Sequence, residues 1–160
     1  MELLGILAEK LYGAEEMKTD KKGKKNMEEL KWKYVKELKD ENAIKQFEDE
    51  NDFKFEEEFK DIVKQYNGGR PRPNTFDTQK RKECVFKSLL SFNKGECDIF
   101  EVKKWIENIS NEKLIPFASE PSGNYICFDN NHNVVSLIHE TGKIEFISKS
   151  FSEFLNKLYE

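Results

Sequence analysis

The sequence predicts an α+β fold in which helices flank a bent, mainly antiparallel sheet. Over roughly the first two thirds of the chain, apolar side chains recur at intervals of three and four residues, the spacing of amphipathic helices. In the last fifty residues they form short runs joined by turns too short for the crossovers that parallel strands need. One more helical run closes the chain, and this order of elements is typical of the α+β class.

The composition is polar but sufficient for a hydrophobic core. Of 160 residues, 36% are charged, and 31 acidic side chains against 27 basic ones give a formal net charge of −4. Leu, Ile, Val and Phe still total 42 residues, about 26%, which exceeds the roughly 20% below which chains stay disordered. Thirteen of these are Phe, whose large rings bury much apolar area. The length suits one domain.

Simple patterns exclude several protein classes. No apolar run approaches the roughly 20 residues that span a bilayer, and the N-terminus lacks the positive region of a signal peptide. Cys84, Cys97 and Cys127 are odd in number and lack C-x-x-C spacing, which argues against a disulfide framework and a zinc site. We therefore expect a cytoplasmic protein with reduced thiols and no membrane contact.

The sequence divides into an N-terminal segment of residues 1–25, which either docks on the domain or extends from it, and a single domain over residues 26–160. A helix is predicted over residues 1–13, with one apolar side made of Leu3, Leu4, Leu7 and Leu11. Residues 18–25 then hold five lysines around a glycine, which is typical of a linker or an exposed loop.

Three helices are predicted before residue 67. Asn26 and Glu29 resemble a capping box, and the helix after them would bury a stripe of Leu30, Tyr34, Val35 and Leu38. After a break at residues 40–42, a second short helix would bury Ala43, Ile44 and Phe47. The third has a continuous apolar face of Phe55, Phe59, Ile62, Val63 and Tyr66.

The third helix is expected to end at Asn67-Gly68-Gly69, because Gly and Asn adopt the left-handed conformation that closes helices. A polar loop is predicted over residues 70–83, which Pro71 and Pro73 keep extended. A strand over residues 85–92 follows. Asp98 then caps a helix whose buried side consists of Ile99, Val102, Ile106 and Ile109.

The last part of the chain predicts an antiparallel meander and a closing helix. Four strands are expected over residues 114–118, 125–129, 134–140 and 144–148. Ser150 and Glu153 form a capping box for the helix, which would bury Phe151, Phe154, Leu155 and Leu158.

Three motifs resemble, in order, the SUKH superfamily, which includes the yeast cell-wall assembly regulator and many bacterial toxin-immunity proteins. They are the helix ending at Tyr66-Asn67-Gly68-Gly69, the stretch of residues 115–129, and the terminal box of residues 150–155. The resemblance covers residues 42–158. The sequence departs from the family pattern at Glu120, where Asp is more usual, and at Pro121, where Gly is frequent.

The resemblance implies a strongly bent sheet flanked by helices and a domain that binds a protein without catalysis. In bacterial members the partner is mostly a toxin, often a nuclease. The motif residues would have structural roles, and here they are Asn67, Gly68, Gly69, Pro116, Gly123, Ser150, Phe151 and Phe154. The partner-binding surface varies among members, so it has to be sought in this sequence alone.

No group of side chains in the sequence points to an enzyme, a metal site or a cofactor. His132 and His139 are separated by a loop, whereas a metal site needs three or more converging ligands. No Ser, Thr or Cys has the G-x-S-x-G surroundings of a hydrolase nucleophile, and Gly68-Gly69 lacks phosphate-loop spacing. We therefore expect no catalytic residues and no cofactor.

Charge is unevenly distributed along the chain. Residues 48–61 hold eight acids and two lysines, a local balance of −6, whereas residues 70–87 hold six bases and two acids, a balance of +4. On one interpretation, these segments are solvated faces that neutralise each other across the fold. Alternatively, an acidic face docks a basic nuclease, since complementary potentials speed association and reject wrong partners.

The sheet offers a second candidate surface. If Ile126, Phe128, Val135 and Leu137 pack under the helices, alternation would send polar residues of the strands to the outer face. A two-sided core explains the same pattern. Together the two surfaces give seven candidate partner-binding residues: Glu56, Glu57, Asp61, Glu120, Asp129, Glu140 and Glu145.

Three functions remain open from the sequence. The first is an immunity protein that binds and neutralises a toxin domain, and the second is an interaction module for signalling or scaffolding. The third is a nucleic-acid-binding regulator that uses residues 70–82 and 18–25, although the mild acidity of the whole chain argues against it.

Overall fold

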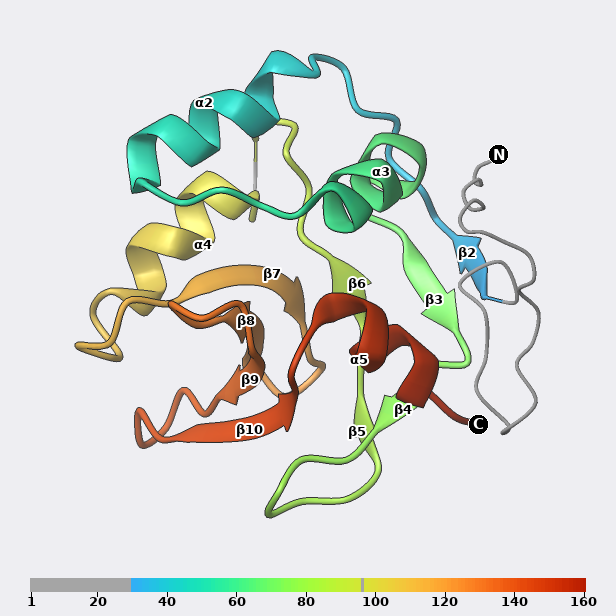
Figure 1. Ribbon diagram of the computed structural model, residues 1–160, viewed down its shortest axis with the longest axis vertical. Coiled ribbons are helices and arrows are strands. Elements are labelled where there is room, and N and C mark those ends of the chain that lie inside the picture. The colour runs from blue at the N-terminus through green and yellow to red at the C-terminus, as the bar shows by residue number, and fades with distance from the viewer. Residues whose placement is uncertain (1–29, 96) are drawn as a thin grey trace.

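The computed structural model describes residues 30–95 and 97–160 (Figure 1). The predicted helix over residues 1–13, the lysine-rich segment and the Asn26–Glu29 cap lie outside these residues. Helices α2 (Asn42–Asn51) and α3 (Glu57–Tyr66) lie together at one end of the molecule. Helix α4 (Ile99–Ile106) packs against the first long strand, and α5 (Phe151–Lys157) lies beside the last. None of the described helices is long and apolar enough to cross a membrane.

A five-stranded sheet forms the centre of the fold. Its strands are β6 (Ser88–Leu89), β7 (Ile115–Ser119), β8 (Tyr125–Phe128), β9 (Val134–Leu137) and β10 (Ile144–Ser148). Their order is β10-β9-β8-β7-β6 and every neighbouring pair is antiparallel. The register shifts near Pro116 and near Ile147, and such irregularities bend a strand. The predicted α+β class and the bent antiparallel meander are confirmed.

Two small ribbons were not predicted. Strands β2 (Lys31–Lys33) and β3 (Arg70–Arg72) form one, and β4 (Thr75–Phe76) and β5 (Cys84–Val85) form the other. The polar loop expected over residues 70–83 therefore contains two strands. The single strand expected over residues 85–92 is also wrong, because β5 and β6 belong to different sheets. The chain changes partners at this point: the Phe86 amide donates to Asn74, whereas the Lys87 amide donates to Ser119.

The helix predicted from residue 26 through Leu38 is wrong where the structure describes it. Residues 31–33 are a strand, and Trp32 stacks on the ring of Tyr66 with the two centroids 5.3 Å apart. Tyr34 has a φ of 57°, which is incompatible with a right-handed helix, and its side chain is exposed. Pairing with β3 and the packing of Trp32 override the local helical pattern.

The other predicted helices are confirmed, with small changes at their ends. Asp98 accepts a hydrogen bond from the Glu101 amide at 2.9 Å, and Ser150 accepts one from the Glu153 amide at 3.0 Å, so both predicted caps are present. Helix α3 begins one residue after Glu56. Phe55 therefore lies in the link between α2 and α3 rather than in the helix, although its ring is buried.

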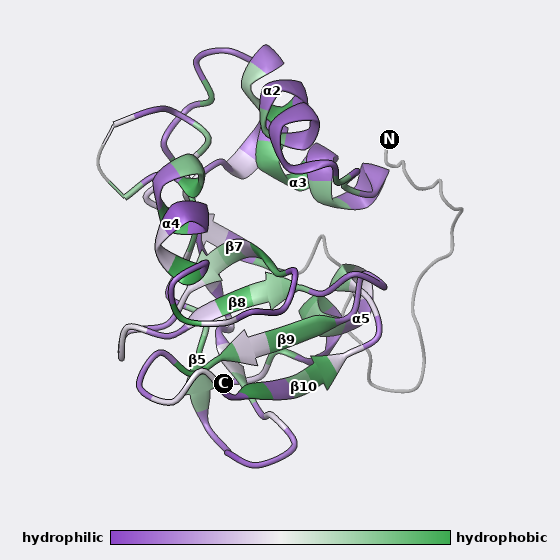
Figure 2. Cartoon of the chain, turned by 90° about the vertical axis from the view of Figure 1, so that its left-hand side faces the viewer, coloured by the Kyte–Doolittle hydropathy of each residue, from purple (hydrophilic) through white to green (hydrophobic). Residues whose placement is uncertain are grey.

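Aromatic rings fill the space between the helices and the sheet. Eleven of the thirteen Phe are buried, and Phe117 stacks on Phe128 with centroids 4.3 Å apart. Phe59 of α3 meets Phe128 of β8 at 5.3 Å and Phe151 of α5 at 5.1 Å. Figure 2 shows the apolar strands of the sheet below α2 and α3, whose outer sides are hydrophilic. These ring contacts fix α3 on the sheet.

The two faces of the sheet differ from the prediction. Directly paired residues of antiparallel strands share a face, and Ile126 pairs with Ser136, which in turn pairs with Glu145. Val135 and Leu137 lie on the opposite face from Ile126, so the four apolar residues predicted to pack together are split between two faces. Strand β9 is buried along its whole length, which shows that the two-sided core is the correct alternative.

The Asn-Gly-Gly motif ends α3 as predicted and joins three segments. Gly68 has a φ of +71°, a conformation that glycine adopts without strain. At Gly69 a Cβ atom would lie only 2.8 Å from the Tyr66 carbonyl oxygen. The buried Asn67 side chain donates to the Lys36 carbonyl at 2.8 Å and accepts from the Phe92 amide at 2.9 Å. Its side chain thus connects two loops that are remote in the sequence.

Candidate partner-binding surface

A dense group of exposed acidic side chains lies on α2, α3 and the link between them. We call it the acidic band, and its seven exposed carboxylates belong to Asp49, Glu50, Asp52, Glu56, Glu57, Glu58 and Asp61. Three of the predicted partner-binding residues, Glu56, Glu57 and Asp61, are members. Only two lysines, Lys54 and Lys60, lie within the same stretch. The band is therefore a surface of strongly negative potential.

The link that carries the band is held by one buried carboxylate. Glu48 is only 4% exposed; its Oε2 accepts a hydrogen bond from the Phe55 amide at 2.8 Å and lies 3.6 Å from the Lys60 ammonium. Phe53 and Phe55 bury their rings on either side of Lys54. Glu48 is one of the eight acids counted in residues 48–61, and nothing in the local pattern marks it as the buried one. Its role is to anchor the link to both helices.

Crowding of like charges leaves the band poorly neutralised. Partial desolvation, together with the neighbouring Glu57, raises the pKa of Asp61. Lys60 lies 3.3 Å from Glu57, but it also contacts Glu48, and Lys45 lies 3.5 Å from Asp49. A cationic surface that approached the band would relieve the remaining repulsion between its carboxylates.

Asp129 and Glu140 occupy two turns of the meander. The Asp129 carboxylate accepts hydrogen bonds from the amides of Asn131 and Asn133, both at 2.9 Å, and so shapes the turn between β8 and β9. In the same turn, the His132 ring stacks on Phe53 with centroids 4.7 Å apart, which places the turn against the link of the acidic band. Glu140 is exposed in the next turn. None of the described contacts joins Glu140 to the band.

Glu120 and Glu145 were predicted to contact a partner, but the structure buries both. Arg81 reaches from the loop between β4 and β5, and its Nε donates to Glu145 at 2.7 Å. Its two terminal nitrogens donate to Glu120 at 3.5 Å and to Ser136 at 3.0 Å, and the Ser136 hydroxyl donates to Glu120 at 2.6 Å. The reason for the error is the sheet register, which puts Ser136 and Glu145 on the same face as Ile126.

The two carboxylates of this buried network differ in their ionisation. Burial raises the pKa of Glu120 despite the hydrogen bonds from Ser136 and Arg81. Burial also acts on Glu145, but the hydrogen bonds from Arg81 and Thr78 outweigh it and lower the pKa of that carboxyl group. One guanidinium is therefore shared by two acids, and its primary role is to hold the loop of residues 77–83 on the sheet.

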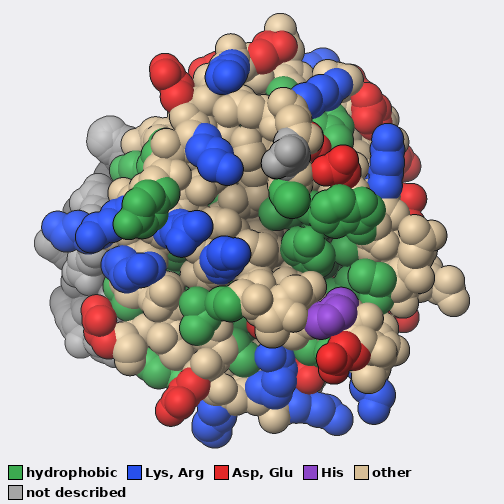
Figure 3. Space-filling view, turned by 180° about the vertical axis from the view of Figure 1, so that it is seen from behind, with side chains coloured by type: hydrophobic (Ala, Val, Ile, Leu, Met, Phe, Trp, Pro, Cys, Tyr) green, Lys and Arg blue, Asp and Glu red, His purple; other side chains and the backbone are tan. Residues whose placement is uncertain are grey.

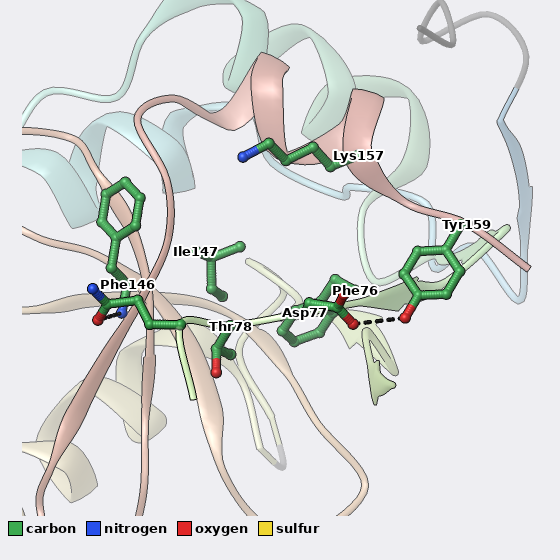
Figure 4. A pocket seen from close by; sticks show the side chains of 8 residues that line it. Phe76, Asp77, Thr78, Phe146, Ile147, Lys157 and Tyr159 are labelled. Atoms are coloured by element: carbon green, nitrogen blue, oxygen red, sulfur yellow. Dashed lines mark hydrogen bonds between the residues drawn. The ribbon is translucent and has the colours of Figure 1, made fainter. Parts of the chain in front are cut away.

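A groove of about 420 Å³ lies beside this loop (Figure 4). Its floor includes Phe76 and Ile147, and Lys157 and Tyr159 stand on its rim. The Tyr159 hydroxyl donates to Asp77 at 2.6 Å, and the Tyr159 backbone pairs with Thr75. These polar groups bind one another, so they fasten the C-terminal residues to β4.

The remaining candidate ligands and nucleophiles are dispersed. All three cysteines are free, and burial raises the pKa of Cys127, which keeps that side chain as a neutral thiol. The His139 ring shares a hydrogen bond with the Asn124 side chain at 2.8 Å. Within the described part of the chain, no three His, Cys, Asp or Glu side chains converge in a way that suits a metal ion.

The bent antiparallel sheet, the helices packed over it and the glycine-terminated α3 define a small α+β domain. The SUKH_6 family model, described as SMI1-KNR4 cell-wall, matches the chain over residues 41–155. The chain therefore belongs to this family, and the resemblance stated from its three motifs is confirmed over nearly the same residues. A comparison with curated proteins gave no match.

Proposed function

We propose that this protein is a non-catalytic immunity protein that binds a basic toxin domain, in many cases a nuclease, and blocks its active site. Membership of the SMI1-KNR4 family is the observation that carries the proposal, and the acidic band supports it. The free thiols agree with action in the cytoplasm, where such a toxin would meet its target.

The acidic band is the proposed docking surface. A nuclease that binds nucleic acid presents cationic side chains to phosphates, and the seven exposed carboxylates of the band offer a protein surface of the same sign as phosphate. Because a basic partner favours the ionised form of Asp61, whose pKa is raised in the free protein, binding would release protons. Affinity would then weaken as the pH falls through the carboxyl pKa values.

The proposal predicts a stoichiometric complex with the toxin domain encoded beside this protein. Co-expression should protect cells from the toxin, and the purified pair should elute together in size-exclusion chromatography. In a toxin assay with purified components, activity should fall in proportion to added protein and vanish near equimolar ratio. Separate elution, or undiminished toxin activity at a molar excess, would refute the proposal.

A second candidate function is an interaction module in signalling or scaffolding. The description of the matched family model, which refers to the cell wall and to no toxin, favours it. Recovery of a partner that is not a toxin, through the same acidic band, would support this alternative.

A further inference from the structure

A second charged surface lies on the two-stranded sheet of β2 and β3. Across the ladder, Lys31 faces Arg72 and Lys33 faces Arg70. All four side chains are exposed, whereas Trp32 and Pro71 between them face inward. We call these four residues the basic ribbon. Figure 3 shows Lys and Arg side chains gathered on the side of the molecule where β2 and β3 lie.

Among the described residues, the pairing within the basic ribbon brings like charges together. Like charges that face each other directly destabilise neighbouring strands. In residues 30–95 and 97–160, the ion pairs involve other side chains, and none neutralises a member of the ribbon. An arrangement of this kind is stabilised when an anion lies across the four cations.

Tyr34 adds an exposed aromatic ring to the end of the ribbon. The side chain is 69% exposed, and the Arg70 guanidinium carbon lies 5.2 Å from the ring centroid. Its backbone φ of 57° is strained for a bulky residue, and the exposed ring buries little area in return. Strain kept at an exposed side chain is typical of a functional position.

We propose that the basic ribbon and Tyr34 bind single-stranded nucleic acid. Side chains two residues apart on a strand lie about 6.6 Å apart, so each strand offers a row of cations to successive phosphates. The Tyr34 ring offers a flat surface on which a base stacks, and stacking on aromatic rings beside a cationic track is the general mode of single-strand binding. An acidic protein would use the cations but has no comparable need for an exposed ring.

This activity is independent of toxin binding, because the ribbon shares no residue with the acidic band. The net charge of −4 does not oppose it, since the electrostatic footprint of a binding site is local. The structure also sharpens the nucleic-acid hypothesis drawn from the sequence. That hypothesis included Arg81, which the structure shows bound to buried carboxylates. It did not include Lys31 and Lys33, because a helix was expected over those residues.

The test is the binding of a short fluorescent single-stranded RNA, measured by anisotropy over a range of salt concentrations. We expect the logarithm of the association constant to fall linearly with the logarithm of the salt concentration. The slope should be about −3, since about four phosphate contacts contribute about 0.7 each. The double variant Lys31→Glu/Arg72→Glu should bind at least about tenfold more weakly and with a shallower slope. The matched control Lys104→Glu/Lys143→Glu changes the net charge equally at exposed sites outside the ribbon and should bind within about twofold of the wild type.

The variant Tyr34→Gly separates binding from folding. Glycine adopts the left-handed conformation freely, so the melting temperature should not fall, whereas loss of stacking should weaken RNA binding roughly tenfold. The proposal is overturned if RNA fails to bind at low salt, if binding does not depend on salt, or if the two double variants behave alike. Tighter binding of an oligoglutamate peptide than of RNA would also overturn it, in favour of an acidic protein partner.

Discussion

Replacement of Arg81 by Ala is expected to lower the free energy of unfolding by about 3 kcal/mol, which is the low end of the usual cost of breaking a buried ion pair. Glu120 and Glu145 are 4% and 9% exposed, and their carboxylates would lose their shared cation. The low end applies because the Arg81 side chain itself keeps 33% exposure. Urea denaturation at neutral pH, followed by circular dichroism, measures this change.

The difference in the free energy of unfolding between the wild type and Arg81→Ala should depend on pH. In the wild type the lowered pKa of Glu145 contributes stability that is present above the ordinary Glu pKa and is lost as the pH falls towards the folded-state value. The raised pKa of Glu120 has the opposite sign, so this acid protonates first. Once both acids are protonated, neither needs Arg81, and the two proteins should approach each other in stability.

Arg81→Lys is the matched control, because it keeps the charge but lacks the fork that reaches three acceptors. The free energy of unfolding of Arg81→Lys should lie between those of the wild type and Arg81→Ala. An Arg81→Ala protein as stable as the wild type, or a deficit that persists unchanged in acid, would contradict the account of the buried network.

Phe59→Ala should be at least as costly, with a loss of about 3–5 kcal/mol in the free energy of unfolding. The Phe59 ring is 1% exposed and lies within 6 Å of four other rings, those of Phe55, Phe117, Phe128 and Phe151. Removing it leaves a cavity between α3, α5 and the sheet. Calorimetric unfolding measures the loss, and hydrogen exchange should show the fastest opening in α3.

Phe146→Ala provides the comparison, since Phe146 lies half-buried at the rim of the groove. It deletes the same atoms but leaves no enclosed cavity, so its cost should be well below that of Phe59→Ala. Equal losses for the two variants would show that Phe59 is not central to the packing of α3.

The elements that the sequence predicted correctly are those that local signals specify. Helices α4 and α5 begin at caps whose donor and acceptor lie three residues apart, and α3 ends at an Asn-Gly-Gly motif. The antiparallel meander was predicted because its strands are joined by only a few residues, too few for the crossovers that parallel strands need. The acidic band was predicted in part because its charges are contiguous in the sequence.

The errors arose where contacts between distant residues decide the structure. Trp32 pairs with Pro71 and stacks on Tyr66, and neither neighbour is visible from the pattern around residue 32. Glu120 and Glu145 look exposed until the strand register and Arg81 bring them together. Their burial, like the basic ribbon, could be recognised only after the strands were paired.

The most direct test of the proposed function is the affinity of charge-reversed variants for the toxin domain, measured by titration calorimetry. Glu56→Lys/Asp61→Lys reverses two charges of the acidic band, and Glu37→Lys/Glu112→Lys makes the same net change at exposed sites outside it. We expect the first variant to bind at least about tenfold more weakly, while the second binds like the wild type. Equal affinity of both variants would contradict the assignment of the acidic band as the docking surface.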